Sequence, residues 1–176
     1  MAHVSDITFL SQGAIIQEFK VAGHNIVQSF PTSEQYLTGP FFGETIGRVA
    51  NRIKDGVVDN LNGKSYSLAQ NNGKNHLHGG NQGWGKKKFS GPHPVDRNGR
   101  EGVKFVYLSP DGEEGYPGTV ELRVWYTAYD DQEDNVSKRI LEAEYEVEFV
   151  GNECDETAVN VTNHRCVVLA TFWDEC

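Results

Sequence analysis

The sequence predicts an all-β fold, an antiparallel β-sandwich, and three observations support this prediction. First, residues 141 to 150 (LEAEYEVEFV) alternate between apolar and acidic side chains, which is the two-residue period of a strand with one buried face. Second, Asn-Gly and Asp-Gly pairs, which accept the positive φ of tight turns, recur at Asn62-Gly63, Asn72-Gly73, Asn98-Gly99 and Asp111-Gly112. Third, no segment shows a sustained apolar period of 3.6 residues, so long helices are not expected.

Other extended segments are short and are separated by these turns. Strands are expected at residues 7 to 10, 14 to 21, 25 to 30, 103 to 108 and 120 to 129, of which the last two are rich in Val, Tyr, Trp and Thr. The segment LNGKSYSL at 61 to 68 predicts a hairpin around Asn62-Gly63. With 176 residues and no repeat or linker, the chain is expected to form a single domain over 1–176.

Composition and charge argue against several kinds of partner. The net charge of −9 disfavours nucleic acid and anionic membranes, and no apolar run approaches the ~20 residues that span a bilayer. The short basic cluster Lys86-Lys87-Lys88 is interpreted as a solvated turn. Cys154, Cys166 and Cys176 match no zinc spacing. With no signal peptide expected, reduced thiols and a cytoplasmic location are the simplest interpretation.

The segment NNGKNHLHGG at 71 to 80 contains the most informative polar residues. In an extended chain His76 and His78 lie on one face, and Gly79 and Gly80 would let a second backbone or a ligand approach. Three interpretations are open: a metal site with His164 as a third ligand, an acid–base site for a neutral polar substrate, and a loop held by hydrogen bonds. No carboxylate follows before Asp96, which argues against the cupin-type metal site.

Four blocks in register resemble the galactose mutarotases, or aldose 1-epimerases. They are GETIGRVANRI at 43 to 53, NHLHGG at 75 to 80 with Gly83-Trp84, SPDGEEGYPG at 109 to 118, and VNVTNH at 159 to 164. The resemblance runs from about Gly13 to His164. It implies the mutarotase-like supersandwich fold and an isomerase that interconverts the α and β anomers of hexoses such as galactose or glucose.

The resemblance also implies roles for four residues. His164 matches the general acid that protonates the ring oxygen of the sugar, and His78 matches a substrate-binding residue on the ring-oxygen side. Asn51 and Arg52 match groups that hydrogen-bond sugar hydroxyls. His76 has no implied role and is interpreted as local support, while the two glycines are expected to make room for the sugar. The partner is a small aldose, and no cofactor or metal is required.

Other polar residues near these blocks are interpreted as structural. The acidic row from Glu142 to Glu148 is expected to be a solvated face without a catalytic role. Glu113, Glu114 and Tyr116 lie in a turn and are expected to support it.

The resemblance ends after His164. Residues 165–176 form a divergent tail, whereas the family continues with strands that complete the sandwich and carry a glutamate base and a substrate-binding aspartate. The sandwich is therefore expected to be incomplete on its C-terminal side, with low activity, poor solubility and self-association through exposed strands. The apolar segment VVLATFW at 167 to 173 is either a substitute strand or an exposed segment. Two alternative functions remain open: a non-catalytic sugar-binding module and a metal-dependent cupin-like enzyme.

Overall fold

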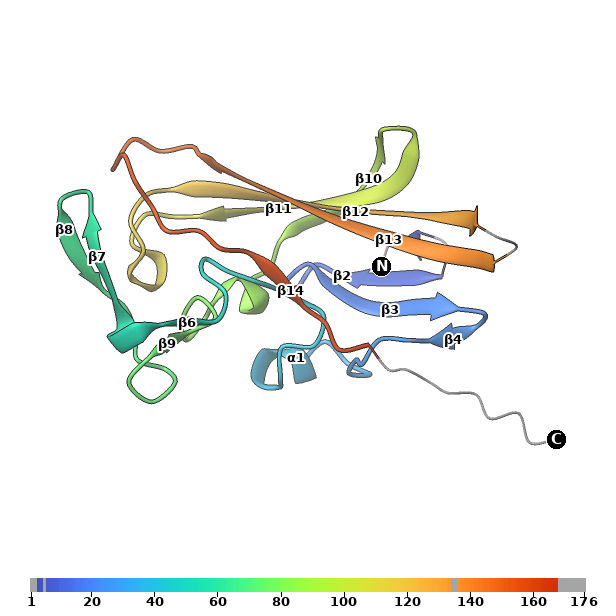
Figure 1. The fold of residues 1–176 in the computed structure, drawn as a ribbon, viewed down its shortest axis with the longest axis horizontal. Helices are drawn as coiled ribbons and strands as arrows, with labels where there is room; N and C mark the ends of the chain where they lie inside the picture. The colour runs from blue at the N-terminus through green and yellow to red at the C-terminus, as the bar shows by residue number, and fades with distance from the viewer. Residues whose placement is uncertain (1–2, 5, 134–135, 168–176) are drawn as a thin grey trace.

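The computed structural model describes residues 3–4, 6–133 and 136–167, and these residues form antiparallel sheets with little helix (Figure 1). The strands are β1 (His3–Val4), β2 (Ile7–Leu10), β3 (Ile15–Val21), β4 (His24–Asn25), β5 (Glu44–Ile46), β6 (Arg52–Ile53), β7 (Val57–Leu61), β8 (Lys64–Ser67), β9 (His76–Leu77), β10 (Ser90–Arg97), β11 (Arg100–Ser109), β12 (Val120–Glu133), β13 (Val136–Phe149) and β14 (Thr162–His164). The helical segments are α1 (Gln35–Thr38) and the single turns η1 (Lys54–Gly56), η2 (Trp84–Lys86) and η3 (Glu113–Gly115). The predicted all-β class is confirmed.

Two four-stranded sheets form the layers of the sandwich. One has the order β1-β2-β3-β4 and the other β10-β11-β12-β13, and Figure 1 shows them as two layers. Their facing side chains form one hydrophobic cluster, because alternate residues of each strand point toward the opposite layer. Its members include Phe9, Ile16, Phe105, Leu122 and Tyr126, all at most 1% exposed. Phe9 stacks on Tyr126 with ring centroids 5.1 Å apart.

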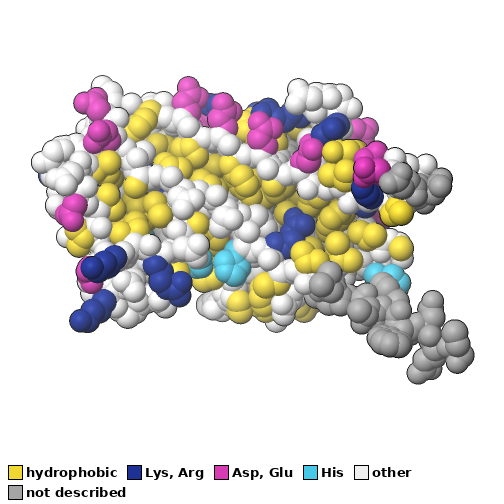
Figure 2. Space-filling model, in the orientation of Figure 1, with side chains coloured by type: hydrophobic (Ala, Val, Ile, Leu, Met, Phe, Trp, Pro, Cys, Tyr) yellow, Lys and Arg dark blue, Asp and Glu magenta, His cyan; other side chains and the backbone are white. Residues whose placement is uncertain are grey.

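The alternating segment at 141 to 150 forms the C-terminal part of β13, as predicted, but its apolar face is only half-buried. β13 is the last strand of its sheet, and among the described residues no strand pairs with its other edge. Figure 2 shows a broad apolar area across this face, below a row of acidic side chains. Exposed fractions of 57% for Val136 and 39% for Phe149 agree with an incompletely covered strand.

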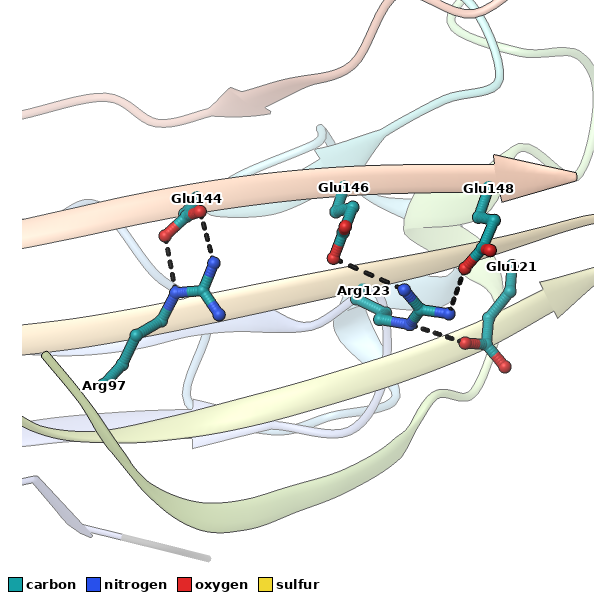
Figure 3. Close-up of polar contacts among 6 residues, drawn as sticks. All are labelled: Arg97, Glu121, Arg123, Glu144, Glu146 and Glu148. Atoms are coloured by element: carbon teal, nitrogen blue, oxygen red, sulfur yellow. Dashed lines mark hydrogen bonds and ion pairs between the residues drawn. The ribbon is translucent and has the colours of Figure 1, made fainter.

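The acidic row is solvated, as predicted, and it is also neutralised by arginines from other strands of the same sheet (Figure 3). Arg97 of β10 forms a bidentate ion pair with Glu144. Arg123 of β12 contacts Glu148 at 2.6 Å and Glu146 at 3.4 Å. Like charges at every second position of one strand repel each other, and these guanidinium groups offset that repulsion.

The strand predictions differ from the structure at the segment from 25 to 30, at β10, and at the short strands β1, β5, β6, β9 and β14, which were not predicted. The hairpin at 61 to 68 is confirmed, since Asn62 and Gly63 have φ of 50° and 70° between β7 and β8. The strand expected at 25 to 30 is wrong beyond Asn25, where Asn25 Oδ1 instead accepts the backbone N–H groups of Phe19 and Val27. β10 was not predicted because it contains two prolines, which lack a backbone N–H. An edge strand tolerates them, because backbone N–H groups on its outer side have no partner strand.

The short sheets join distant segments around the resemblance blocks. β14 pairs with β5, which places His164 opposite Glu44, and β6 pairs with β9, which places Arg52 opposite Leu77. Residues 168–176, including most of the apolar tail segment, lie outside the described residues. Within the described residues, no helix has both the length and the apolar character needed to cross a membrane.

The guanidinium of Arg48 connects these segments in the interior. Arg48 is 1% exposed, and its Nη1 donates to the carbonyl oxygen of Pro117 at 2.7 Å and to Thr157 Oγ1 at 3.1 Å. Its Nη2 donates to Ser109 Oγ at 2.8 Å and to the carbonyl oxygen of Pro110 at 3.2 Å. Both terminal nitrogens are therefore paired, as a buried cation requires, while the buried Nε has no hydrogen-bond partner among the described residues.

Replacing this guanidinium should destabilise the fold strongly. Arg48→Met leaves the buried carbonyl and hydroxyl acceptors without a donor, and we expect a loss of about 2–4 kcal/mol in the free energy of unfolding. The measurement is urea unfolding followed by tryptophan fluorescence. Arg123→Met is the control, because its exposed partners remain hydrated, and it should change the unfolding midpoint little. Equal losses in the two variants would contradict the role given to Arg48.

Candidate active site

The four predicted site residues come from three segments that the short sheets bring together. Asn51 and Arg52 lie at the start of β6, His78 directly follows β9, and His164 ends β14. The β6–β9 pairing places the first two segments side by side. Contacts of His78 with Asn51 and with His164 then connect the three segments.

Asn51 and His78 hold each other through reciprocal hydrogen bonds. The backbone N–H of His78 donates to the carbonyl oxygen of Asn51 at 3.0 Å, and the N–H of Asn51 donates to His78 Nδ1 at 3.2 Å. Both residues have left-handed backbone conformations, with φ of 57° and 51°. Since Nδ1 accepts a hydrogen bond, the ring is neutral with its proton on Nε2. Nε2–H has no partner among the described residues, so it is free to donate to a ligand.

The surroundings of His78 favour this neutral form. Burial lowers the pKa of His78 to about 4, and the nearby charges of His164 and Arg52 lower it further in the same direction. His78 is 9% exposed. At neutral pH the imidazole of His78 is therefore a neutral hydrogen-bonding group and carries no extra proton for transfer.

His78 and His164 form an aromatic cluster with Phe41. The two imidazole centroids are 5.2 Å apart with planes at 88°, and Phe41 lies 4.9 Å from His78 and 5.7 Å from His164. Nδ1 of His164 is buried and has no hydrogen-bond partner among the described residues. An unpaired buried ring nitrogen is costly unless it serves a ligand or a proton transfer, which makes His164 a candidate acid–base group.

A cavity of about 350 Å³ opens beside this cluster. Its lining combines one imidazole, one aromatic ring, amides and a lysine, from Phe41, Asn71, Leu77, His78, Gly80, Asn81, Gly83, Gly85 and Lys86. Asn71 shapes the wall, because its side chain accepts from the N–H of Leu77 and donates to the carbonyl oxygens of Leu77 and Gly80. Figure 2 shows histidine side chains at the surface below the apolar area.

Asn51 and Arg52 do not line this cavity, but both lie close to His78, which does. Arg52 is exposed and its Nε donates to Asn72 Oδ1 at 3.0 Å, while its charge acts on His78. His78 lines the cavity, and His164 contacts it through His78 and Phe41. The four predicted residues therefore gather around one imidazole.

His76 has a different task from His78, and the prediction that both share one extended face is wrong. The extended segment ends at Leu77, and the left-handed conformation of His78 turns the chain. His76 is fully buried, with its Nδ1 2.8 Å from the carbonyl oxygen of Ala69 and its Nε2 2.8 Å from the hydroxyl of Tyr116. Both ring nitrogens are satisfied, in agreement with its interpretation as local support.

The two glycines after His78 make room for protein atoms, contrary to the expected space for a sugar. A Cβ at Gly79 would lie 1.7 Å from the carbonyl oxygen of Gly47, and one at Gly80 would lie 2.1 Å from Glu114 Oε2. The carboxylate of Glu114 accepts the N–H groups of Asn81 at 2.8 Å and Gln82 at 3.0 Å. The structural role expected of Glu114 agrees with these contacts.

The ion pair between Glu44 and Lys86 beside the cavity was not predicted from the sequence, and Lys86 was misinterpreted. Lys86 was expected in a solvated turn, but its side chain is 9% exposed and its Nζ lies 2.7 Å from Glu44 Oε1. Glu44 is fully buried, and burial raises the pKa of its carboxyl to about 7 although Lys86 opposes this shift. A run of three lysines gives no signal for one of them turning inward, since the partner lies 42 residues away.

Metal ligands were a further open interpretation of the histidines. Two imidazoles lie together at the cavity, but within residues 3–4, 6–133 and 136–167 no group of three or more His, Cys, Asp or Glu side chains is arranged to hold an ion. The described donors at this place thus provide two of the three ligands that such a site would need.

Comparisons with known proteins agree with the geometry. Residues 2–170 match the aldose 1-epimerase family. Galactose mutarotase of Sus scrofa is 41% identical over 147 residues, which are 83% of this chain and 38% of that protein. Bifunctional protein gal10 of Schizosaccharomyces pombe is 35% identical over 94% of this chain and 23% of its own length.

Solved structures give the same relationship. Galactose 1-epimerase from Lactobacillus acidophilus is similar with a TM-score of 0.68 and 28% identity, covering 90% of this chain and 44% of that one. A GalM/aldose epimerase homologue from C. elegans has a TM-score of 0.71 and 28% identity over 92% and 46%. The chain therefore spans less than half the length of each of these four relatives.

The titration of His78 is a direct test of the site geometry. We expect its imidazole to stay neutral down to pH near 5 and to titrate near the pKa of about 4. Since the unfolded chain binds this proton at the ordinary pKa of 6.5, the stability contributed by neutral His78 is present above that value and is lost as pH falls toward 4. The measurement is the imidazole shift of His78 in ¹H–¹³C NMR spectra against pH.

The variant His78→Gln isolates this contribution to stability. Its free energy of unfolding should fall less than that of the wild-type chain between pH 6.5 and 4. Glu44 acts in the opposite direction in both proteins, because its raised pKa favours proton uptake by the folded state. A midpoint for His78 at or above 6.5, or identical pH profiles for the two chains, would contradict the neutral assignment.

Proposed function

Because the chain belongs to the aldose 1-epimerase family, we propose that it binds a hexose such as galactose or glucose and takes part in the interconversion of its anomers. The substrate and the activity are proposals, since the chain covers 38% of the mutarotase relatives that it matches over 147 residues. The single observation that carries the proposal is the pair of imidazoles of His78 and His164, 5.2 Å apart, of which His78 lines the cavity.

The roles proposed for the four residues follow from their protonation and exposure. His164 protonates the ring oxygen, and its position beside His78, with ring centroids 5.2 Å apart, supports this assignment. His78 donates a hydrogen bond from Nε2 to an oxygen of the sugar, in keeping with its neutral tautomer. Arg52 and Asn51 bind hydroxyl groups beside His78, where the exposed guanidinium offers several donors.

The reaction then needs one further group. Ring opening transfers a proton to the ring oxygen while a base removes the proton of the C1 hydroxyl. The C1–ring oxygen bond breaks, the aldehyde end rotates, and closure reverses both transfers. The cavity lining contains an imidazole and an ammonium group but no carboxylate to serve as that base. We therefore expect low interconversion rates from this chain.

A non-catalytic sugar-binding module is the second candidate, and the same lining favours it. Polar groups that orient a ligand are present, while the proton acceptor is absent from the described wall. Binding without measurable interconversion is the result that separates this candidate from the first.

Sugar titrations test both candidates. Galactose and glucose should shift the NMR signals of His78 and His164, and calorimetry should give an affinity that falls about threefold to tenfold in His78→Gln. Interconversion, measured by NMR exchange between anomers, should fall about 100-fold or more in His164→Gln if it occurs in the wild-type chain. His93→Gln is the matched control, because His93 is exposed on β10 and bonds only to Ser90 among the described residues.

The outcomes of these titrations are distinct. Saturable binding with exchange supports the epimerase, and saturable binding without exchange supports the sugar-binding module. The absence of any sugar-dependent shift at the two imidazoles would refute both.

We further propose self-association through β13, supported by its unpaired edge and the exposed fractions of Val136 and Phe149. Sedimentation analysis across a range of concentrations checks this, and a chain that stays monomeric would contradict it. The cytoplasmic location expected from the sequence stays a prediction.

A further inference from the structure

The buried ion pair between Glu44 and Lys86 has no role in the proton transfers described above. Glu44 lies on β5 directly opposite His164 of β14, and Lys86 ends η2 and lines the cavity. Gly85 leaves the space for this pair, because a Cβ there would lie 2.1 Å from Glu44 Oε2. Moving two charges into the interior is unfavourable unless their contacts are nearly complete.

The ammonium of Lys86 has three hydrogen-bond acceptors, and two of them belong to one segment. Nζ donates to Glu44 Oε1 at 2.7 Å, to the carbonyl oxygen of Tyr36 at 2.6 Å and to that of Gly39 at 3.3 Å. These acceptors occupy its three donors, so Lys86 has none left for a ligand. The last two acceptors belong to α1 and its C-terminal cap. Lys86 thus fastens the chain at 36 to 39 to the cavity wall.

Phe41 follows this fastened segment after one proline. The ammonium of Lys86 lies 4.7 Å from the centroid of the Phe41 ring, which is the geometry of a cation–π contact. The same ring touches both imidazoles, at 4.9 Å from His78 and 5.7 Å from His164. A continuous chain of contacts therefore leads from Glu44 through Lys86 and Phe41 to the two histidines.

We propose that Glu44 and Lys86 form a positioning pair that places Phe41 against His78 and His164 and thereby sets the distance and angle between the two imidazoles. The benefit for sugar binding rests on the function proposed above, whereas the placement of the rings does not. Neither Glu44 nor Lys86 has a free donor for the substrate, so the pair acts on the site through Phe41.

The placement is tested without sugar. In the wild-type chain, NMR should detect nuclear Overhauser contacts from the Phe41 ring to both imidazoles. Lys86→Met keeps the length of the side chain but removes the ammonium, and Phe41→Leu removes the ring but leaves the ion pair. We expect Lys86→Met to lose or weaken the Phe41–histidine contacts, and both variants to shift the imidazole signals of His78 and His164.

Lys87→Met is the matched control. Lys87 also pairs with a carboxylate, Glu113 at 3.0 Å, but it contacts neither Phe41 nor a histidine. Its imidazole signals should match those of the wild-type chain. If Lys86→Met fails to fold, Glu44→Gln replaces it, because the amide preserves shape and one acceptor while it removes the charge, and a smaller change of the same kind is expected.

Sugar binding provides the second measurement. The galactose affinity should fall about threefold to tenfold in Lys86→Met and Phe41→Leu, and should stay unchanged in Lys87→Met. Folded Lys86→Met or Glu44→Gln chains with unchanged ring contacts and imidazole signals would overturn the proposal, whatever the sugar result. If the wild-type chain binds no sugar, the proposed function fails, and the ring contacts still decide whether the pair positions Phe41.

Discussion

The site depends first on the pairing of the Arg48 guanidinium in the interior. Arg48 lies between β5, which carries Glu44, and the Asn51-Arg52 pair, so its position sets theirs. Apart from Thr157 Oγ1, its acceptors belong to the turn from Ser109 to Pro117. The same turn also holds the cavity wall, because the carboxylate of Glu114 accepts the backbone N–H groups of Asn81 and Gln82. A single buried cation thus relates two walls of the cavity to each other, since its donors permit few other arrangements.

Different roles are proposed for the imidazoles of His78 and His164 because their hydrogen bonds differ. Nδ1 of His78 is engaged by a backbone N–H, while Nδ1 of His164 is buried and unengaged among the described residues. The hydrogen bond to Nδ1 fixes the tautomer of His78, and burial disfavours its charged form. His78 therefore offers a directed hydrogen bond from Nε2. The proposed proton transfer therefore falls to His164. Similar side chains acquire unlike properties because their environments differ, and the sequence alone does not display those environments.

Much of the fold was predictable because its signals are local. The period of two in β13 and the Asn62-Gly63 turn each lie within ten residues, and both were predicted correctly. β10 escaped prediction because prolines hide an edge strand. The candidate site was predictable to the extent that motifs carry it: the four blocks pointed to His78 and His164, whose roles are proposals. Lys86, Glu44 and Phe41 escaped because their contacts connect segments far apart in sequence, and no local pattern distinguishes a buried lysine from a solvated one.

The left-handed backbone at Asn51 and His78 has a consequence for engineering. At His78 a bulky or β-branched replacement would have to adopt the left-handed dihedral and would also lose the imidazole that accepts the N–H of Asn51, whereas at Asn51, which contributes backbone groups only, the cost is the dihedral alone. Asn81 lines the same cavity without either constraint on its own backbone, since its φ is not positive. A mutational library that seeks a new sugar preference should therefore keep 51 and 78 constant and randomise 81, where altered side chains change the wall and leave the scaffold intact.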